Sequence, residues 1–158
     1  MSLLSVEGLD KSFGGVVAAR DVTFAVEAGK LLAIIGPNGA GKSTTFNMLG
    51  GQLQPDRGRV VLAGQEITGL APRRIWRLGV GRTFQVAQTF VSMTVVENVQ
   101  MALVSWHGRT RAWWPEATKL YREEALALLE RVGMGDNADR PCSELAYGDV
   151  KRVELAIA

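Results

Sequence analysis

Eight consecutive residues carry the clearest chemical signal in the sequence. Residues 36–43 read GPNGAGKS and match the pattern G-x-x-x-x-G-K-[ST] at each fixed position. The glycines Gly36, Gly39 and Gly41 allow a tight backbone turn in which successive N–H groups point inward at one anion. We expect the backbone N–H groups of Asn38, Gly39 and Gly41 to donate to phosphate oxygens. The segment therefore predicts a phosphate-binding loop.

The residues that follow the glycines add a charge and two hydroxyl groups. Lys42 supplies a positive charge for β- and γ-phosphates, Ser43 offers a hydroxyl to Mg²⁺, and Thr44 offers a further phosphate bond. A helix that begins here adds the positive end of its dipole. Together these groups predict a site for Mg²⁺ and a nucleoside triphosphate. The alternative is a glycine-rich turn that only joins two elements. A dinucleotide fingerprint is excluded, because G-x-G-x-x-G has a different spacing.

Two elements must position this loop. Residues 31–35 are all apolar and stop at Gly36, which is typical of a strand buried on both faces of a parallel sheet. Residues 42–49 have a helix-compatible composition and end at the pair Gly50 and Gly51. The sequence thus predicts a central strand, the loop and a helix, in that order.

Further elements flank this unit on both sides. A glycine pair at residues 14–15 separates two β-like segments and predicts a hairpin. From Thr94 apolar residues recur at helical spacing, and Thr94 with Glu97 has the form of a capping box. We expect strands at residues 3–9, 16–26, 59–62 and 80–84, a short helix from Pro72, and helices from Thr94 to Trp106, Glu116 to Val132 and Gly148 to Ala158. The predicted division is an ATP-binding core with a β part over residues 1–93 and a helical subdomain over residues 94–158.

Composition limits the kinds of protein that the chain can be. Its 158 residues, 47% hydrophobic and 22% charged, suit a globular α/β chain rather than a disordered one. A net charge of +2 is too small for the electric field of the whole protein to attract nucleic acid, so we expect no nucleic-acid partner. The lone Cys142 and the lack of a membrane-length apolar run indicate a cytoplasmic protein in a reducing compartment. Residues 109–114 contain arginines and tryptophans that can bind an anionic surface, although a solvated loop is the commoner explanation.

Three further motifs identify a family. Residues 143–149 (SELAYGD) resemble the signature motif of ATP-binding cassette (ABC) proteins, and residues 81–85 (GRTFQ) resemble their glutamine loop. Residues 11–15 (KSFGG) place an aromatic ring where that family stacks adenine. With the phosphate loop, these motifs look most like the ATPase subunits of branched-chain amino-acid importers. The resemblance implies a P-loop NTPase core of the α/β class with an N-terminal antiparallel β part and a helical subdomain.

The resemblance also assigns roles to single residues. Phe13 would stack on adenine, although a hairpin core aromatic is the alternative, and Gln85 would contact Mg²⁺ or the attacking water as a catalytic residue. The signature residues would face the ATP of a second copy, which implies a head-to-tail dimer. The ATP-binding set is Phe13, Gly36, Asn38, Gly39, Ala40, Gly41, Lys42, Ser43 and Thr44; the metal set is Ser43 and Gln85; the signature set is Leu145, Ala146, Tyr147, Gly148 and Asp149.

The signature departs from the general LSGGQ pattern at three positions. Ala146 stands where the pattern has serine, so a hydroxyl contact to the γ-phosphate is lost. Tyr147 replaces a glycine and Asp149 replaces the glutamine, although Tyr147 matches the importer subgroup. A carboxylate beside phosphate is repulsive unless Asp149 turns outward.

Hydrolysis in this family needs an Asp after an apolar strand, an adjacent Glu and a later histidine, all beyond the signature helix. No Asp of the chain follows four apolar residues, and the single histidine, His107, precedes the signature. We therefore expect an N-terminal fragment of an importer ATPase subunit, in which the C-terminal part of the core is missing. The alternatives are a nucleotide-binding module without turnover and an ABC ATPase for another substrate. The expected partners are ATP, transmembrane permease subunits at the inner membrane and a second ATPase subunit.

Overall fold

The structure, a computed structural model, describes residues 2–84, 86–109 and 119–158. The chain divides into two compact units, Met1–Val80 and Gly81–Ala158, which are described separately below. The boundary expected from the motifs, after residue 93, lies inside the second unit. The assignment of an ATP-binding core and a helical subdomain to residues 1–93 and 94–158 stays a prediction.

The first unit is built on a four-stranded antiparallel sheet with the strand order β2-β1-β3-β4. The predicted hairpin is confirmed, because β1 and β2 pair around Gly14 and Gly15, whose φ angles of 52° and 88° suit glycine. The two-residue β4 had no counterpart in the sequence prediction. The strands are β1 (Ser2–Phe13), β2 (Val16–Glu27), β3 (Arg57–Leu62) and β4 (Gln65–Glu66).

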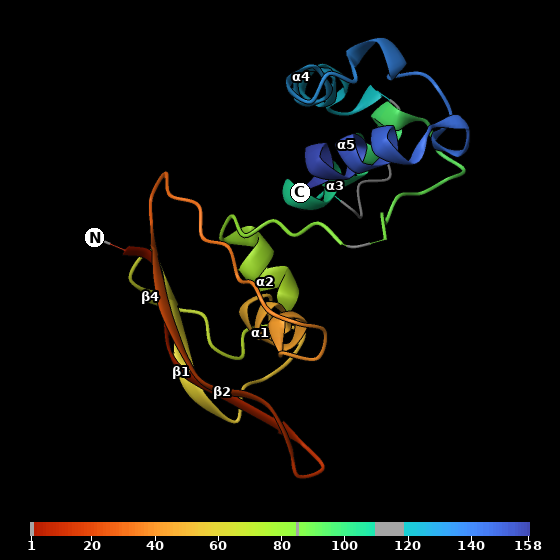
Figure 1. The fold of residues 1–158 in the computed structure, drawn as a ribbon. Helices are drawn as coiled ribbons and strands as arrows, with labels where there is room; N and C mark the ends of the chain where they lie inside the picture. The colour runs from red at the N-terminus through yellow and green to blue at the C-terminus, as the bar shows by residue number, and fades with distance from the viewer. Residues whose placement is uncertain (1, 85, 110–118) are drawn as a thin grey trace. The chain divides into compact units, whose positions relative to one another are not determined.

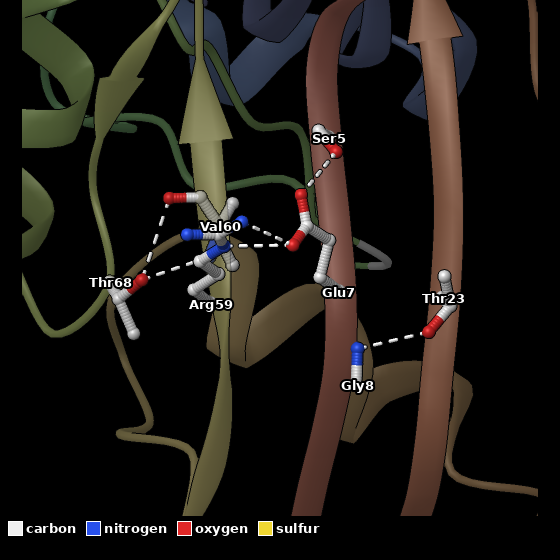
Figure 2. A network of polar contacts seen from close by, with 7 residues as sticks. All are labelled: Ser5, Glu7, Gly8, Thr23, Arg59, Val60 and Thr68. Carbon is white, nitrogen blue, oxygen red and sulfur yellow. Dashed lines mark hydrogen bonds and ion pairs between the residues drawn. The ribbon is translucent and has the colours of Figure 1, made fainter.

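Polar side chains accompany the pairing of the two central strands, β1 and β3, and join β3 to the segment after β4 (Figure 2). Val6 of β1 lies opposite Val60 of β3, and Glu7 lies opposite Arg59. The Glu7 carboxylate accepts the Arg59 Nε–H at 2.8 Å, and the backbone N–H of Val60 donates to the Thr68 hydroxyl at 2.8 Å. A slip by one residue would bring Glu7 to the buried face, so this pairing also fixes which side chains form the core.

Two helices complete the first unit and lie on one face of the sheet (Figure 1). They are α1 (Lys42–Leu49) and α2 (Pro72–Arg77), both as the sequence predicted. Met48 and Ile75 are each 2% exposed and pack with the sheet residues. The buried cluster of this unit consists of Val6, Leu9, Ala19, Met48, Val60, Ile67 and Ile75.

One predicted strand of the first unit is wrong. Residues 31–35 form no strand, and the side chains of Leu31 and Ile35 are 97% and 89% exposed. An apolar run becomes a buried strand only when neighbouring strands accept and donate its backbone hydrogen bonds. None of the strands that the structure describes lies beside this run. The strand predicted over residues 80–84 is wrong for the same reason.

The second unit is helical, with α3 (Val95–Trp106), α4 (Arg122–Arg131) and α5 (Tyr147–Ile157) and the short 3-10 turns η2 (Gly135–Asn137) and η3 (Cys142–Glu144). The predicted capping box is confirmed, because Thr94 and Glu97 bond reciprocally at the start of α3. Hydrogen bonds from the Thr94 backbone and hydroxyl hold the pKa of Glu97 below its ordinary value. The helix expected from Glu116 begins only at Arg122, and residues 116–118 lie outside the described part.

The core of the second unit joins α3, α4 and α5. Its buried cluster consists of Val95, Val96, Val99, Leu103, Ala125, Leu129, Met134, Ala138, Cys142 and Val153. Burial raises the pKa of the Cys142 thiol, which keeps it protonated. Across the described ranges of both units, no helix combines the length and apolarity needed to cross a bilayer.

Candidate functional site

The loop of residues 36–41 is shaped by a close backbone approach at its last glycine. Gly41 has a φ of 79° and caps α1 in the left-handed conformation. A Cβ atom at this position would lie 2.0 Å from the carbonyl oxygen of Ala18 on β2. Only glycine fits here, since both the backbone angle and the space exclude a side chain. The hairpin therefore sets where the loop turns into the helix.

The Lys42 side chain folds back over the loop. Its Nζ donates to the carbonyl oxygens of Gly36 and Pro37, each at 2.7 Å. The ammonium is thus held beside the backbone that the sequence predicts as a phosphate cradle. The Ser43 side chain is exposed in the first turn of α1, and Thr44 is half-buried beside it.

Backbone N–H groups at this helix start are available to an anion. The first helical bond in the turn is made by the Thr45 N–H, which donates to the Gly41 carbonyl at 2.9 Å. The N–H groups just before it precede the intrahelical ladder, as at any helix start. Ala40 differs, because its N–H donates to the Pro37 carbonyl at 3.2 Å. The phosphate contacts of Asn38, Gly39 and Ala40 stay predictions.

Phe13 lies at the end of β1, next to the glycine turn. Its side chain is 50% exposed, and the Lys11 Nζ lies 5.7 Å from the ring centroid. A half-exposed ring with a cation nearby can accept a planar ligand on its free surface. The contact of Phe13 with adenine stays a prediction.

Gln85 lies outside the described residues, so its predicted contact with Mg²⁺ or water stays a prediction. The residue before it is firmly held. The Phe84 N–H donates to Glu154 Oε1 at 2.9 Å, and Lys151 Nζ donates to Glu154 Oε2 at 2.8 Å and to the Phe84 carbonyl oxygen. Glu154 is 4% exposed. Burial raises the pKa of Glu154, but the bonds from Lys151 and Phe84 outweigh it and hold the pKa below the ordinary value.

The signature residues form the start of α5. Ala146 is the N-cap residue, and Tyr147 begins the helix with its side chain 61% exposed. Apart from its chain neighbours and its own helix backbone, no described atom lies within 4 Å of a Cβ built on Gly148, so the helix start is open at that point. Asp149 lies 3.6 Å from Arg152 in an ion pair, which partly offsets its negative charge. The contact of Leu145 to Asp149 with a second copy's ATP stays a prediction.

Two supporting residues lie in segments that contribute to the family resemblance, ENV at residues 97–99 and KRVELA at residues 151–156, but the sequence assigned them no role. Asn98 is 2% exposed, and its side-chain amide exchanges hydrogen bonds with the Phe90 backbone at 2.7 and 3.1 Å. It also donates to the Thr94 carbonyl at 2.9 Å, which ties residues 90–94 to α3. Glu154 is the other. A signal that could have drawn attention to it is a lone carboxylate within the apolar run VELAI.

Comparison with known proteins agrees with these observations. The family model described as ABC transporter matches residues 19–158. The chain is 39% identical to the high-affinity branched-chain amino acid transport ATP-binding protein LivG of Escherichia coli K12, over 98% of this chain and 63% of that protein. It is 40% identical to the corresponding protein BraF of Pseudomonas aeruginosa, with the same coverage.

A solved structure described as the ADP conformation of MJ1267, an ATP-binding cassette of an ABC transporter, superposes with a TM-score of 0.85 at 33% identity. The alignment covers 99% of this chain and 64% of that one. The chain thus spans just under two thirds of the length of the proteins that it matches. The matched family, the relatives and the shared fold show that this chain belongs to the ABC transporter family of ATP-binding proteins.

Proposed function

We propose that the chain binds Mg-ATP through residues 36–44 and forms the nucleotide-binding part of an importer subunit. The observation that carries this proposal is the geometry of Gly41 and Lys42. Gly41 turns the loop where no side chain fits, and the Lys42 ammonium lies against two loop carbonyls. A charge held beside a helix start is suited to the β- and γ-phosphates.

The residues present fit a magnesium ion that arrives with the nucleotide. Mg²⁺ takes most of its ligands from phosphates and water and needs only one or two from the protein. Ser43 is exposed next to Lys42, so its hydroxyl is a suitable ligand, and Gln85 is the second candidate. Bound Mg²⁺ supplies charge neutralisation for the phosphates, while Lys42 and the helix start hold the triphosphate in place.

Phe13 and the signature extend the proposal to the base and to a partner. Phe13 stacks on adenine, and Leu145, Ala146, Tyr147, Gly148 and Asp149 face the ATP of a second subunit in a head-to-tail dimer. Permease subunits hold the dimer at the inner membrane, on its cytoplasmic side. The transported solutes are branched-chain amino acids or related small polar molecules, in keeping with the names of LivG and BraF.

A second candidate is nucleotide binding without turnover by residues 1–158 alone. Its support is in the sequence, where no Asp follows an apolar strand and the only histidine precedes the signature. The two candidates differ in steady-state phosphate release. We expect the purified 158-residue chain to bind ATP and release no phosphate above the rate of a Lys42→Ala control. Phosphate release well above that of the Lys42→Ala control would instead show that the chain carries all the residues needed for hydrolysis.

Calorimetric titration with Mg-ATP tests the binding site. Lys42→Ala removes a charge-assisted phosphate contact worth about 1.5–3 kcal/mol, so ATP affinity should fall by about tenfold or more. Lys30→Ala is the matched control, since Lys30 is an exposed lysine before the loop. Equal affinities for the Lys42→Ala variant and the wild-type chain would refute the site.

A further inference from the structure

The loop that enters β3 is tied to the end of β1 by one residue. The Asp56 N–H donates to the Asp10 carbonyl at 2.9 Å, and its Oδ2 accepts the Ser12 N–H at 2.8 Å. Its Oδ1 accepts Lys11 Nζ at 2.6 Å. Asp56 therefore holds three successive residues of β1, the last of which directly precedes Phe13. The pairing of β1 with β2 is irregular on both sides of Lys11 and resumes at Ser12 and Phe13, so Asp56 adds a second hold on the strand at the irregular point.

Lys11 connects this carboxylate to the aromatic ring. Its side chain is only 15% exposed, and its Nζ lies 5.7 Å from the Phe13 ring centroid while bonded to Asp56. An ammonium group at this distance attracts the ring face and favours one ring orientation. The Lys11 hydrogen bond, followed by that from Ser12, holds the pKa of Asp56 below its ordinary value, so the carboxylate is charged at neutral pH.

A surface ion pair adds little to stability by itself, because water screens its charges. The position of this one matters more than its strength. Stacking of a base on an aromatic side chain favours binding, and that gain is reduced when binding must first order the ring. A residue that fixes the backbone at Ser12 and the cation at Lys11 lowers this ordering cost.

We propose that Asp56 is a positioning residue for nucleobase binding, which acts through Lys11 and Ser12 to hold the Phe13 ring ready to stack. The inference rests on the proposed function, because it assigns the base to Phe13. It adds that recognition of the base depends on the loop before β3 as well as on the aromatic residue.

The test separates base binding from phosphate binding. Calorimetry compares Mg-ATP with inorganic tripolyphosphate, which carries the phosphates and lacks the base. Asp56→Ala should weaken the binding of ATP by about threefold or more and leave the affinity for tripolyphosphate unchanged, because only the contribution of base stacking is lost. The ATP affinity of Asp56→Asn should lie between those of wild type and Asp56→Ala. The amide oxygen can still accept a hydrogen bond from the Ser12 N–H, but it carries no charge to attract Lys11. Phe13→Ala should weaken ATP by about fivefold or more, again without affecting tripolyphosphate.

Glu7→Gln is the matched control. The Glu7–Arg59 pair, with an N–O distance of 2.7 Å, is another ion pair of β1, which it joins to β3 (Figure 2). Glu7 is farther from Phe13 in the sequence of β1 than Lys11 is. Glu7→Gln should leave the affinities for ATP and for tripolyphosphate unchanged. An equal loss of ATP and tripolyphosphate affinity in Asp56→Asn would show a merely structural role and overturn the inference, as would no loss in Asp56→Ala. If Phe13→Ala has no effect, the inference fails while the phosphate site stands. If Lys42→Ala binds like wild type, the proposed function itself fails.

Discussion

Removal of the buried carboxylate of Glu154 should free the segment that precedes Gln85. Glu154 is 4% exposed on α5 and accepts hydrogen bonds from the Phe84 N–H and from Lys151. Glu154→Ala leaves the Phe84 N–H without its acceptor and leaves Lys151 without its counter-ion. Breaking a fully buried pair costs about 3–5 kcal/mol. The Lys151 side chain is 29% exposed and can reach water, so we expect a smaller loss, about 2 kcal/mol.

The assay is amide hydrogen exchange at Phe84, measured by NMR on the same chain. A loss of about 2 kcal/mol corresponds to about thirtyfold faster exchange if the amide exchanges by local opening. Glu154→Gln keeps an acceptor for the Phe84 N–H and loses only the charge assistance, so its exchange should rise by about fivefold. Glu144→Ala, which removes an exposed carboxylate of the same unit, is the control and should leave the rate unchanged. Unchanged exchange at Phe84 in Glu154→Ala would refute the reasoning.

The same contact predicts a pH dependence with a definite sign. The folded chain holds the pKa of Glu154 below its ordinary value of 4.5. The stabilisation from its charge is therefore complete above that value and is lost as the pH falls through the lower, folded pKa. In urea unfolding, the difference between wild type and Glu154→Gln should be constant near neutral pH and shrink in acid. A difference that grows below pH 4.5 would contradict the assigned direction.

Two further substitutions test local features of the fold. Thr94→Ala removes the capping box at the start of α3 and should lower the unfolding free energy by about 1 kcal/mol, measured by urea unfolding; no change would show that the cap is not used in solution. Gly41→Ala places a Cβ 2.0 Å from the Ala18 carbonyl at a φ of 79°, so it should abolish Mg-ATP binding in calorimetry. Gly79→Ala has a similar backbone strain, at a φ of 90°, but its Cβ meets no described atom within 4 Å, so it should retain Mg-ATP binding. ATP binding by Gly41→Ala at wild-type affinity would show that the loop can form without the close approach.

Features with local causes were predictable from the sequence. The β1–β2 hairpin follows from the turn at Gly14 and Gly15, and α1 follows from the loop before it and the glycine pair after it. The capping box of α3 follows from two residues three positions apart. In each case a few neighbouring residues determine the backbone, so no knowledge of distant contacts is needed.

Features that depend on distant residues were not predictable. Residues 31–35 have the composition of a buried strand, but a strand also needs partners, and composition says nothing about them. The bond between Phe84 and Glu154 joins residues 70 apart in the sequence, and the Lys11–Asp56 pair joins residues 45 apart. The phosphate loop was recognisable because its chemistry is local. The close approach of Ala18 to this loop, and the hydrogen bonds of Asp56 to the end of β1, depend on distant contacts that the sequence alone does not give.

Recognition of the terminal phosphates of ATP is the role that we propose for Lys42. The most direct measurement is a calorimetric comparison of Mg-ATP and AMP binding to the wild-type chain and to Lys42→Ala. AMP carries the base and one phosphate but lacks the β- and γ-phosphates that the Lys42 ammonium should contact. We predict that wild type binds ATP at least about tenfold more tightly than AMP, and that Lys42→Ala removes most of this preference by weakening ATP alone. Equal affinities of wild type for ATP and AMP, or a preference that survives in Lys42→Ala, would contradict the claim.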